Sequence, residues 1–218
     1  MKLQLNQIDV QPGERVILRD IGWSEFEQIL EELGHHPSHR LAYYRGTLEI
    51  MVPLPGHEDR KEIIGDLVKV LLEELDIEFR SLGSSTFKQQ IAAIGVEPDA
   101  CFYIQNEAII RGKDRIDLST DPPPDLAIEI DYTTDSQLKK RGYEALGIPE
   151  LWLYNDQALR IYVLREHKYV ESDTSLNFPT ISISNVIPQY FAQSRVEGRN
   201  KAIKAFRAWV VKELTRQI

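Results

Sequence analysis

The sequence is poor in the residues that build disulfide-braced or thiolate-metal folds. Cys101 is the only cysteine among 218 residues, so neither an internal disulfide nor a thiolate zinc cluster can form. The first ten residues, MKLQLNQIDV, also lack the apolar core of a signal peptide. These two absences predict a protein of the reducing cytoplasm.

Long apolar runs and an excess of positive charge are absent as well. No stretch approaches the roughly 20 apolar residues that a membrane-spanning helix needs, so no membrane partner is expected. The 26 Lys and Arg are outnumbered by 34 Asp and Glu, which gives a net charge of -8. A negative protein repels nucleic acid at long range. A local basic patch remains compatible with this charge, because charges beyond about 8 Å are largely screened at physiological salt.

The composition that remains is that of an ordinary globular chain, 42% hydrophobic and 28% charged. A chain of this length buries roughly 70% of its unfolded surface, which is enough for one sizeable core. No internal repeat or low-complexity tract interrupts it. We therefore expect one domain, with a folded core over residues 1–190 and residues 191–218 as a C-terminal helical extension of the same domain.

Apolar periodicity predicts alternating helices and strands along the chain. Helices are expected from Ser24 to a stop at Gly34, and over 57–75, 134–146 and 197–214. Strands are expected over 14–19, 77–82, 87–91, 96–104, 125–131, 151–154, 159–164 and 168–171, with a hairpin over 41–52 and a linker over 176–188. This order predicts an α/β (α+β) fold, in which helices flank a central mixed β-sheet. An N-terminal strand, helix and hairpin precede the sheet, and a C-terminal helix follows it.

Two of the expected strands carry carboxylates among apolar residues. Asp99 lies in EPDACFYI, and Glu129 lies in PPPDLAIEIDYTT. By the period of two, Glu129 shares a face with Asp131 and not with the large apolar residues of its strand, so that face is not expected to be part of the core. If the two strands pair, Asp99 comes to lie beside Glu129.

Such a pair of carboxylates requires compensation. At about 4 Å the two charges repel by roughly 4 kcal/mol at an effective dielectric constant of 20, so one must be protonated or a cation must lie between them. An all-oxygen site suits Mg²⁺, which takes one or two carboxylates and keeps several waters. Water held by such an ion becomes a nucleophile. The pattern predicts a Mg²⁺ site, with Mn²⁺ as an alternative occupant.

Several motifs, in their order and spacing, make residues 20–190 resemble the Uma family of restriction endonucleases, part of the PD-(D/E)XK nuclease superfamily. The motifs are Gly46-Thr47-Leu48-Glu49 with Pro53, His57-Glu58, Glu97-Pro98-Asp99, Pro123-Pro124-Asp125-Leu126-Ala127-Ile128-Glu129 and Gly147-Ile148-Pro149-Glu150-Leu151-Trp152. The resemblance implies a restriction-endonuclease-like fold for residues 1–190. It also implies a metal-dependent endonuclease whose partner is its DNA substrate and which acts as a homodimer.

The resemblance also assigns roles to acidic residues. Asp99 matches the aspartate of the PD motif, and Glu129 matches the acidic member of (D/E)XK; both would hold the metal. Glu58 matches an acidic residue that completes the metal site or binds the metal through water. All three are therefore expected to be catalytic and metal-binding residues.

The lysine of the superfamily motif is displaced in this sequence. Its usual position, two residues after Glu129, is occupied by Asp131. The resemblance implies that the following helix supplies the lysine as Lys139, four residues before Tyr143, with Lys140 as the alternative. A lysine at that place would orient the attacking water or stabilise negative charge on the phosphoryl group.

Two other functions remain open at this point. Asp131 at the lysine position and the acidic net charge favour a catalytically silent, nuclease-like module that binds nucleic acid or protein. The same carboxylates could instead be the acid and base of a glycosidase, which would need no metal and no lysine.

Overall fold

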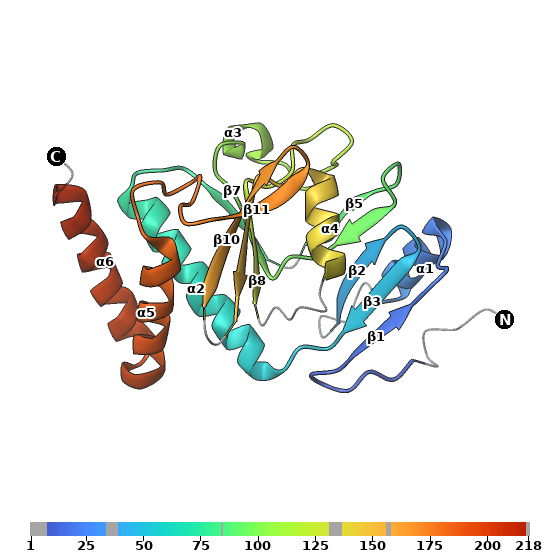
Figure 1. Cartoon of the computed structure of the whole chain (residues 1–218), viewed down its shortest axis with the longest axis horizontal. Coiled ribbons are helices and arrows are strands. Elements are labelled where there is room, and N and C mark those ends of the chain that lie inside the picture. The colour runs from blue at the N-terminus through green and yellow to red at the C-terminus, as the bar shows by residue number, and fades with distance from the viewer. Residues whose placement is uncertain (1–7, 34–38, 84, 131–136, 156–157, 217–218) are drawn as a thin grey trace.

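The computed structural model describes residues 8–33, 39–83, 85–130, 137–155 and 158–216, which form two β-sheets and six helices (Figure 1). The larger sheet contains β4 (Arg80–Leu82), β7 (Ala100–Tyr103), β8 (Leu126–Ile130), β9 (Glu150–Tyr154), β10 (Leu159–Arg165) and β11 (Lys168–Ser172). Its strand order is β11-β10-β9-β8-β7-β4. The sheet is mixed, because β8 and β9 are parallel while the other neighbours are antiparallel.

The smaller sheet is antiparallel throughout and is built from the first half of the chain. It contains β1 (Arg15–Leu18), β2 (Arg40–Tyr44), β3 (Thr47–Met51), β5 (Phe87–Gln89) and β6 (Ile94–Val96), in the order β1-β3-β2-β6-β5. Arg45 and Gly46 make the β2–β3 turn with positive φ angles of 48° and 87°. These values explain why the hairpin turns where the sequence predicted it.

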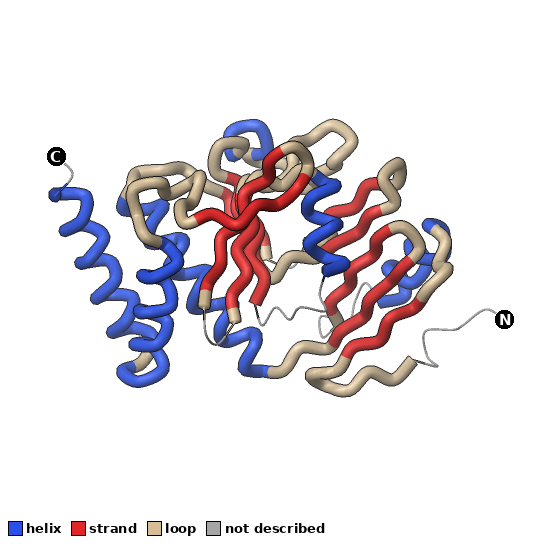
Figure 2. The backbone as a smooth tube through the Cα atoms, viewed as in Figure 1, coloured by secondary structure: helices blue, strands red, loops and turns tan. Residues whose placement is uncertain are grey.

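The helices pack against the two sheets, with α1 on the smaller one (Figure 2). They are α1 (Trp23–Leu33), α2 (Pro55–Glu74), α3 (Glu107–Ile110), α4 (Gln137–Leu146), α5 (Ile183–Glu197) and α6 (Arg199–Arg216). Residues of α2, α5 and α6 share one hydrophobic core with one face of the larger sheet. On the other face, α4 lies between the two sheets and packs on β2 and β6. In the described part of the chain, no helix combines the length and apolar character needed to span a membrane.

These elements confirm the predicted fold class, a mixed sheet flanked by helices after an N-terminal strand, helix and hairpin. The C-terminal helix is also present as α6, and salt bridges from Arg199 to Asp66 and from Arg207 to Glu73 and Glu74 tie it to α2. The expected start of α4 near Thr134 and the expected stop of α1 at Gly34 lie outside the described residues.

Three expectations about single elements are wrong. Residues 96–104 were expected to form one strand, but Pro98 separates β6 from β7, and the two strands belong to different sheets. The expected linker over 176–188 contains the start of α5, which continues through Pro188 to Glu197 and so crosses residue 190. The face of β8 that carries Glu129 was expected to lie outside the core, but α4 and the smaller sheet bury it.

A close contact between α4 and the smaller sheet fixes the position of α4. A Cβ atom added at Gly142 would lie 2.5 Å from Cγ1 of Val96 in β6. Valine has a stiff side chain, so it cannot move aside easily. Glycine is therefore required at this point for the helix to approach the sheet.

We predict that Gly142→Ala destabilises the protein, although alanine is the better helix former. Overpacking of this kind costs about 1–3 kcal/mol, and thermal denaturation measures the loss. The control is the double variant Gly142→Ala/Val96→Ala, which removes the clashing methyl group and should be more stable than Gly142→Ala with Val96 retained. A Gly142→Ala protein as stable as the wild type would contradict the contact.

Candidate active site

Two buried carboxylates lie close together where β7 begins beside β8. Ala100, the first residue of β7, pairs with Ile128, and Asp99 comes just before it in the chain. Oδ2 of Asp99 accepts the backbone N–H of Ile130, the residue after Glu129. Asp99 is 1% exposed and Glu129 3% exposed. The structure therefore brings together the two acidic residues that the sequence singled out.

Two side chains of α4 engage both oxygens of Glu129. The Lys139 ammonium donates to Oε2 of Glu129 at 2.7 Å, and the Tyr143 hydroxyl donates to Oε1. Lys139 and Tyr143 are four residues apart and so lie on the same face of the helix. Lys139 also donates to the carbonyl oxygen of Glu97 at 3.2 Å. Helix α4 thus binds both carboxylate oxygens of Glu129.

Burial and charge shift the pKa values of this group of side chains in different directions. Burial raises the pKa of Glu129 to about 7, and the charge of Asp99 adds to that rise, while Lys139 and Tyr143 oppose it. Burial alone would lower the pKa of Lys139, but the carboxylates of Glu129 and Asp99 raise it above its usual value. Lys139 is therefore a buried ammonium that compensates the two carboxylates.

The two oxygens of Asp99 have different surroundings. Oδ2 accepts the backbone N–H of Ile130 at 2.8 Å and lies 3.2 Å from Nε2 of His57. Oδ1 is buried and has no hydrogen-bond partner within the described residues. Burial would raise the pKa of Asp99, but Lys139, His57 and the Ile130 N–H together hold it below its usual value. Asp99 is thus a buried carboxylate with one oxygen that accepts no hydrogen bond from the described residues.

A cavity of about 130 Å³ borders Asp99 between α2 and the edge of the larger sheet. Its walls include two lysines of α2, Lys61 and Lys69, together with the backbone around Gly83. Polar cavities of this size hold ordered water. The cavity therefore gives water a place beside the aspartate.

Glu58 lies next to the site but is engaged elsewhere. Its Oε1 accepts Nη2 of Arg40 at 2.8 Å, and its Oε2 accepts Nζ of Lys61 at 2.7 Å. Its side chain is 39% exposed. Burial opposes the shift, but Lys61 and Arg40 lower the pKa of Glu58 below its usual value. The Glu58 carboxylate thus contacts Arg40 and Lys61. In the His57-Glu58 motif, it is His57 whose side chain lies beside Asp99.

The geometry separates the two neighbouring lysines. Lys139 points to Glu129, whereas the Lys140 ammonium lies 3.6 Å from the centre of the Tyr162 ring. That second contact is a cation–π interaction at the surface of the sheet. Asp131, which occupies the usual lysine position, lies outside the described residues.

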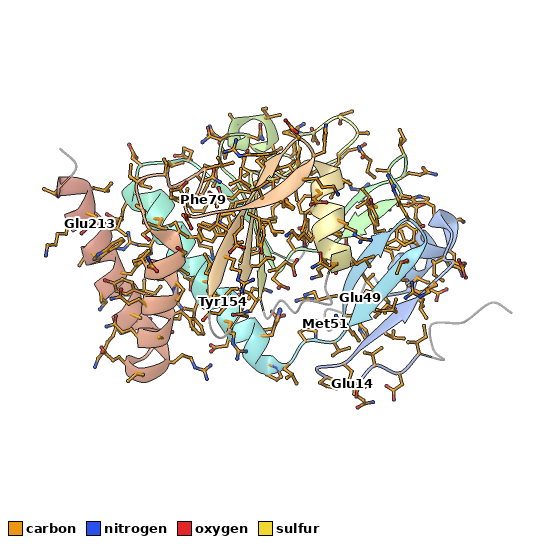
Figure 3. All side chains as sticks on the ribbon, in the orientation of Figure 1. Glu14, Glu49, Met51, Phe79, Tyr154 and Glu213 are labelled. Atoms are coloured by element: carbon orange, nitrogen blue, oxygen red, sulfur yellow. The ribbon has the colours of Figure 1, made fainter. Side chains whose placement is uncertain are left out.

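Sequence reasoning missed three side chains of this site. For Tyr143, the sequence showed only that it follows Lys139 by four residues. His57 belongs to the His57-Glu58 motif, in which only Glu58 was given a role. Glu49 is a buried carboxylate in the apolar strand β3, near α4 (Figure 3). Burial raises the pKa of Glu49, and the charge of Lys139 opposes the rise. Glu49 adds a third acidic group to the surroundings of Lys139.

The carboxylate oxygens of the site are of the donor type that a hard divalent cation takes. Over the ranges that the structure describes, no three His, Cys, Asp or Glu side chains converge as a ready-made metal cluster. The unpartnered Oδ1 of Asp99 and the neighbouring Glu129 supply two carboxylates. That number suits Mg²⁺, which takes one or two carboxylates and keeps its remaining ligands as water.

We predict that Lys139→Met and Lys140→Met differ sharply in stability. Removing one member of a buried ion pair costs about 3–5 kcal/mol, whereas the cation–π contact of Lys140 is worth about 1 kcal/mol or less. The loss in Lys139→Met should be greatest above pH 7, where Glu129 is ionised, and should shrink toward pH 5, where protonation neutralises that glutamate. Urea unfolding at both pH values measures the difference; equal losses for the two variants would contradict the pairing.

Comparisons with known proteins identify the family of the chain. The family model Uma2, described as "Putative restriction endonuclease", matches residues 23–195. No curated protein matches the chain. A solved structure described as "a putative nuclease belonging to DUF820", from Anabaena variabilis ATCC 29413, is 16% identical; the match covers 87% of this chain and 99% of that one, with a TM-score of 0.49. The type IIG restriction endonuclease BpuSI is 13% identical, with 72% of this chain and 17% of that chain covered and a TM-score of 0.37.

Because the family model spans well over half of the 218 residues, the chain belongs to the Uma2 family of restriction-endonuclease-type proteins.

Proposed function

We propose that the chain is a metal-dependent endonuclease that hydrolyses phosphodiester bonds of DNA. Asp99 and Glu129 would hold Mg²⁺ or Mn²⁺, and Lys139 would be the lysine of the site. One observation carries the proposal: two buried carboxylates lie close together at the start of β7 and in β8, with a buried ammonium on one of them. Membership of the Uma2 family supports the same chemistry.

Each carboxylate has a different part in this proposal. When bound, a divalent cation supplies an activated water and neutralises charge that develops on the phosphoryl oxygens. Oδ1 of Asp99 can ligate the cation without breaking a hydrogen bond, because it has none in the described structure. Glu129 can ligate only by sharing an oxygen with Lys139 or Tyr143. The hydroxyl of Tyr143 would then keep the glutamate oriented.

Lys139 acts on the substrate in this proposal. Glu129 would help to hold the cation, and the Lys139 ammonium beside it would donate a hydrogen bond to the attacking water or to a phosphoryl oxygen. Lysine suits this task as a compact positive charge in a site that excludes water. Lys140, which lies on Tyr162, takes no part.

Glu58 reaches the cation only through water in this proposal. Oε1 accepts a hydrogen bond from Arg40 and Oε2 accepts one from Lys61, so direct ligation through either oxygen would compete with an ion pair. Its exposed position beside the site is suited to holding a water instead. Replacement of Glu58 should therefore cost less activity than replacement of Asp99 or Glu129.

Two further parts of the proposal concern assembly and location. Cutting both strands of a duplex takes two sites, which a homodimer with two-fold symmetry supplies. A single buried thiol, Cys101, suits the reducing cytoplasm.

One feature favours a second function, that of a nuclease-like module that binds without cutting. Both oxygens of Glu129 are already engaged, and Asp131 stands at the usual lysine position. If these contacts persist in the presence of Mg²⁺, the chain would bind nucleic acid or a partner protein without hydrolysis.

We predict that Asp99→Asn and Glu129→Gln both abolish Mg²⁺-dependent cleavage of DNA. These isosteric changes are chosen because Glu129→Ala would leave the Lys139 ammonium buried without its partner and would unfold part of the site. Lys139→Met should lower the rate by about 10²–10³ through lost charge stabilisation.

The assay follows nicking and linearisation of a supercoiled plasmid with Mg²⁺, with Mn²⁺ and with EDTA, and Lys140→Met serves as the control that retains activity. Cleavage that persists in Glu129→Gln, or that survives EDTA, would overturn the assignment. Binding of DNA by a wild-type protein that never cuts it would instead support the silent module.

A further inference from the structure

We propose that His57 is a positioning residue for Asp99. Its Nε2–H and the backbone N–H of Ile130 together hold Oδ2 of Asp99, so that Oδ1 is left as the metal-ligating atom. This inference rests on the proposed function, because it assigns the support of the same metal site. It gives His57 a role that the carboxylates and Lys139 do not fill.

The start of α2 fixes His57 in place. Pro55 is the first residue of the helix, and the backbone N–H of His57 donates to the carbonyl oxygen of Leu54 at 2.9 Å. The imidazole is buried, with the residue 3% exposed. Its Nε2 lies 3.2 Å from Oδ2 of Asp99, whereas its Nδ1 is 3.7 Å from Oε1 of Glu58. The ring therefore makes its shorter polar approach to the aspartate.

The proton must lie on Nε2 for this contact to be attractive. An unprotonated ring nitrogen would direct its lone pair at a carboxylate oxygen, and the two would repel. Both the Nε2–H tautomer and the doubly protonated ring place a donor there. Only the tautomer with its proton on Nδ1 is incompatible with the proposed role.

Two donors on one oxygen decide how Asp99 can bind a metal. Oδ2 accepts the Ile130 N–H, and Nε2 of His57 lies 3.2 Å from the same oxygen, so a proton on Nε2 would hold the carboxylate against rotation and leave Oδ1 as the ligating atom. Asp99 also borders the cavity between α2 and the sheet edge. Ligating carboxylates are commonly held by hydrogen bonds of this kind, and loss of such a partner weakens metal binding about 10–100-fold.

The test measures Mn²⁺ binding to the full chain by isothermal titration calorimetry, without DNA and after removal of bound metal. His57→Ala should weaken the Kd for Mn²⁺ about 10–100-fold relative to the wild type. His57→Gln should recover most of the loss, because its amide can place an N–H near the position of Nε2. The control is His167→Asn, a change of an exposed histidine in the β10–β11 turn that should leave the Kd unchanged.

Three results would overturn the proposal, and they differ from failure of the proposed function. If the Kd of His57→Ala for Mn²⁺ is within twofold of the wild-type value, His57 does not position Asp99. If His57→Gln folds but its Kd is as weak as that of His57→Ala, the N–H donor is not what His57 contributes. If His57→Ala fails to fold, ¹⁵N NMR of the wild-type imidazole decides: a proton on Nε2 supports the proposal, and the Nδ1–H tautomer contradicts it. Absence of any Mn²⁺ uptake by the wild type would instead reject the metal site, and this inference with it.

Discussion

The antiparallel pairing of β7 with β8 brings the residue before β7, Asp99, close to Glu129 of β8 in the interior, and much of the surrounding structure compensates for that placement. Asp99 and Glu129 are both nearly inaccessible to water, so their repulsion is not screened by solvent. Lys139 brings a positive charge to Glu129, so removal of either side chain would leave the other buried without its partner and would lower the stability of the fold. Without that ammonium, the same pairing of strands would bury a repulsive pair.

Two helices on different faces of the larger sheet each control one of these carboxylates. Helix α4 holds Glu129 through Lys139 and Tyr143, and it can do so because Gly142 lets it approach the smaller sheet closely. Helix α2 brings His57 to Asp99 from its first turn. The smaller sheet thus has a positional part in the site, since it fixes α4 and contributes Glu49 near the lysine. Glu129 is engaged at both oxygens while Asp99 is open at one, and the two carboxylates are therefore not equivalent as ligands.

The sequence was sufficient for the architecture and for the pair of carboxylates, because both follow from local patterns. Strand alternation and helical periodicity reproduce most elements, and the carboxylates of two apolar strands stand out by their chemistry alone. The remainder depends on contacts between distant segments. Burial of the Glu129 face requires the smaller sheet, whose strands come from residues 15–51 and 87–96. The choice between Lys139 and Lys140 depends on the rotation of α4, and the contact of His57 with Asp99 joins residues 42 positions apart; neither is encoded in the spacing of a motif.

The most direct test of this account is the position of a bound cation in a crystal of the protein soaked in Mn²⁺, located by anomalous scattering. The account predicts one peak within coordination distance of Oδ1 of Asp99 and of the Glu129 carboxylate, with water completing its shell and Glu58 outside it. A peak seated on Glu58 and away from Asp99, or a fully soaked crystal with no peak beside either strand carboxylate, would contradict it.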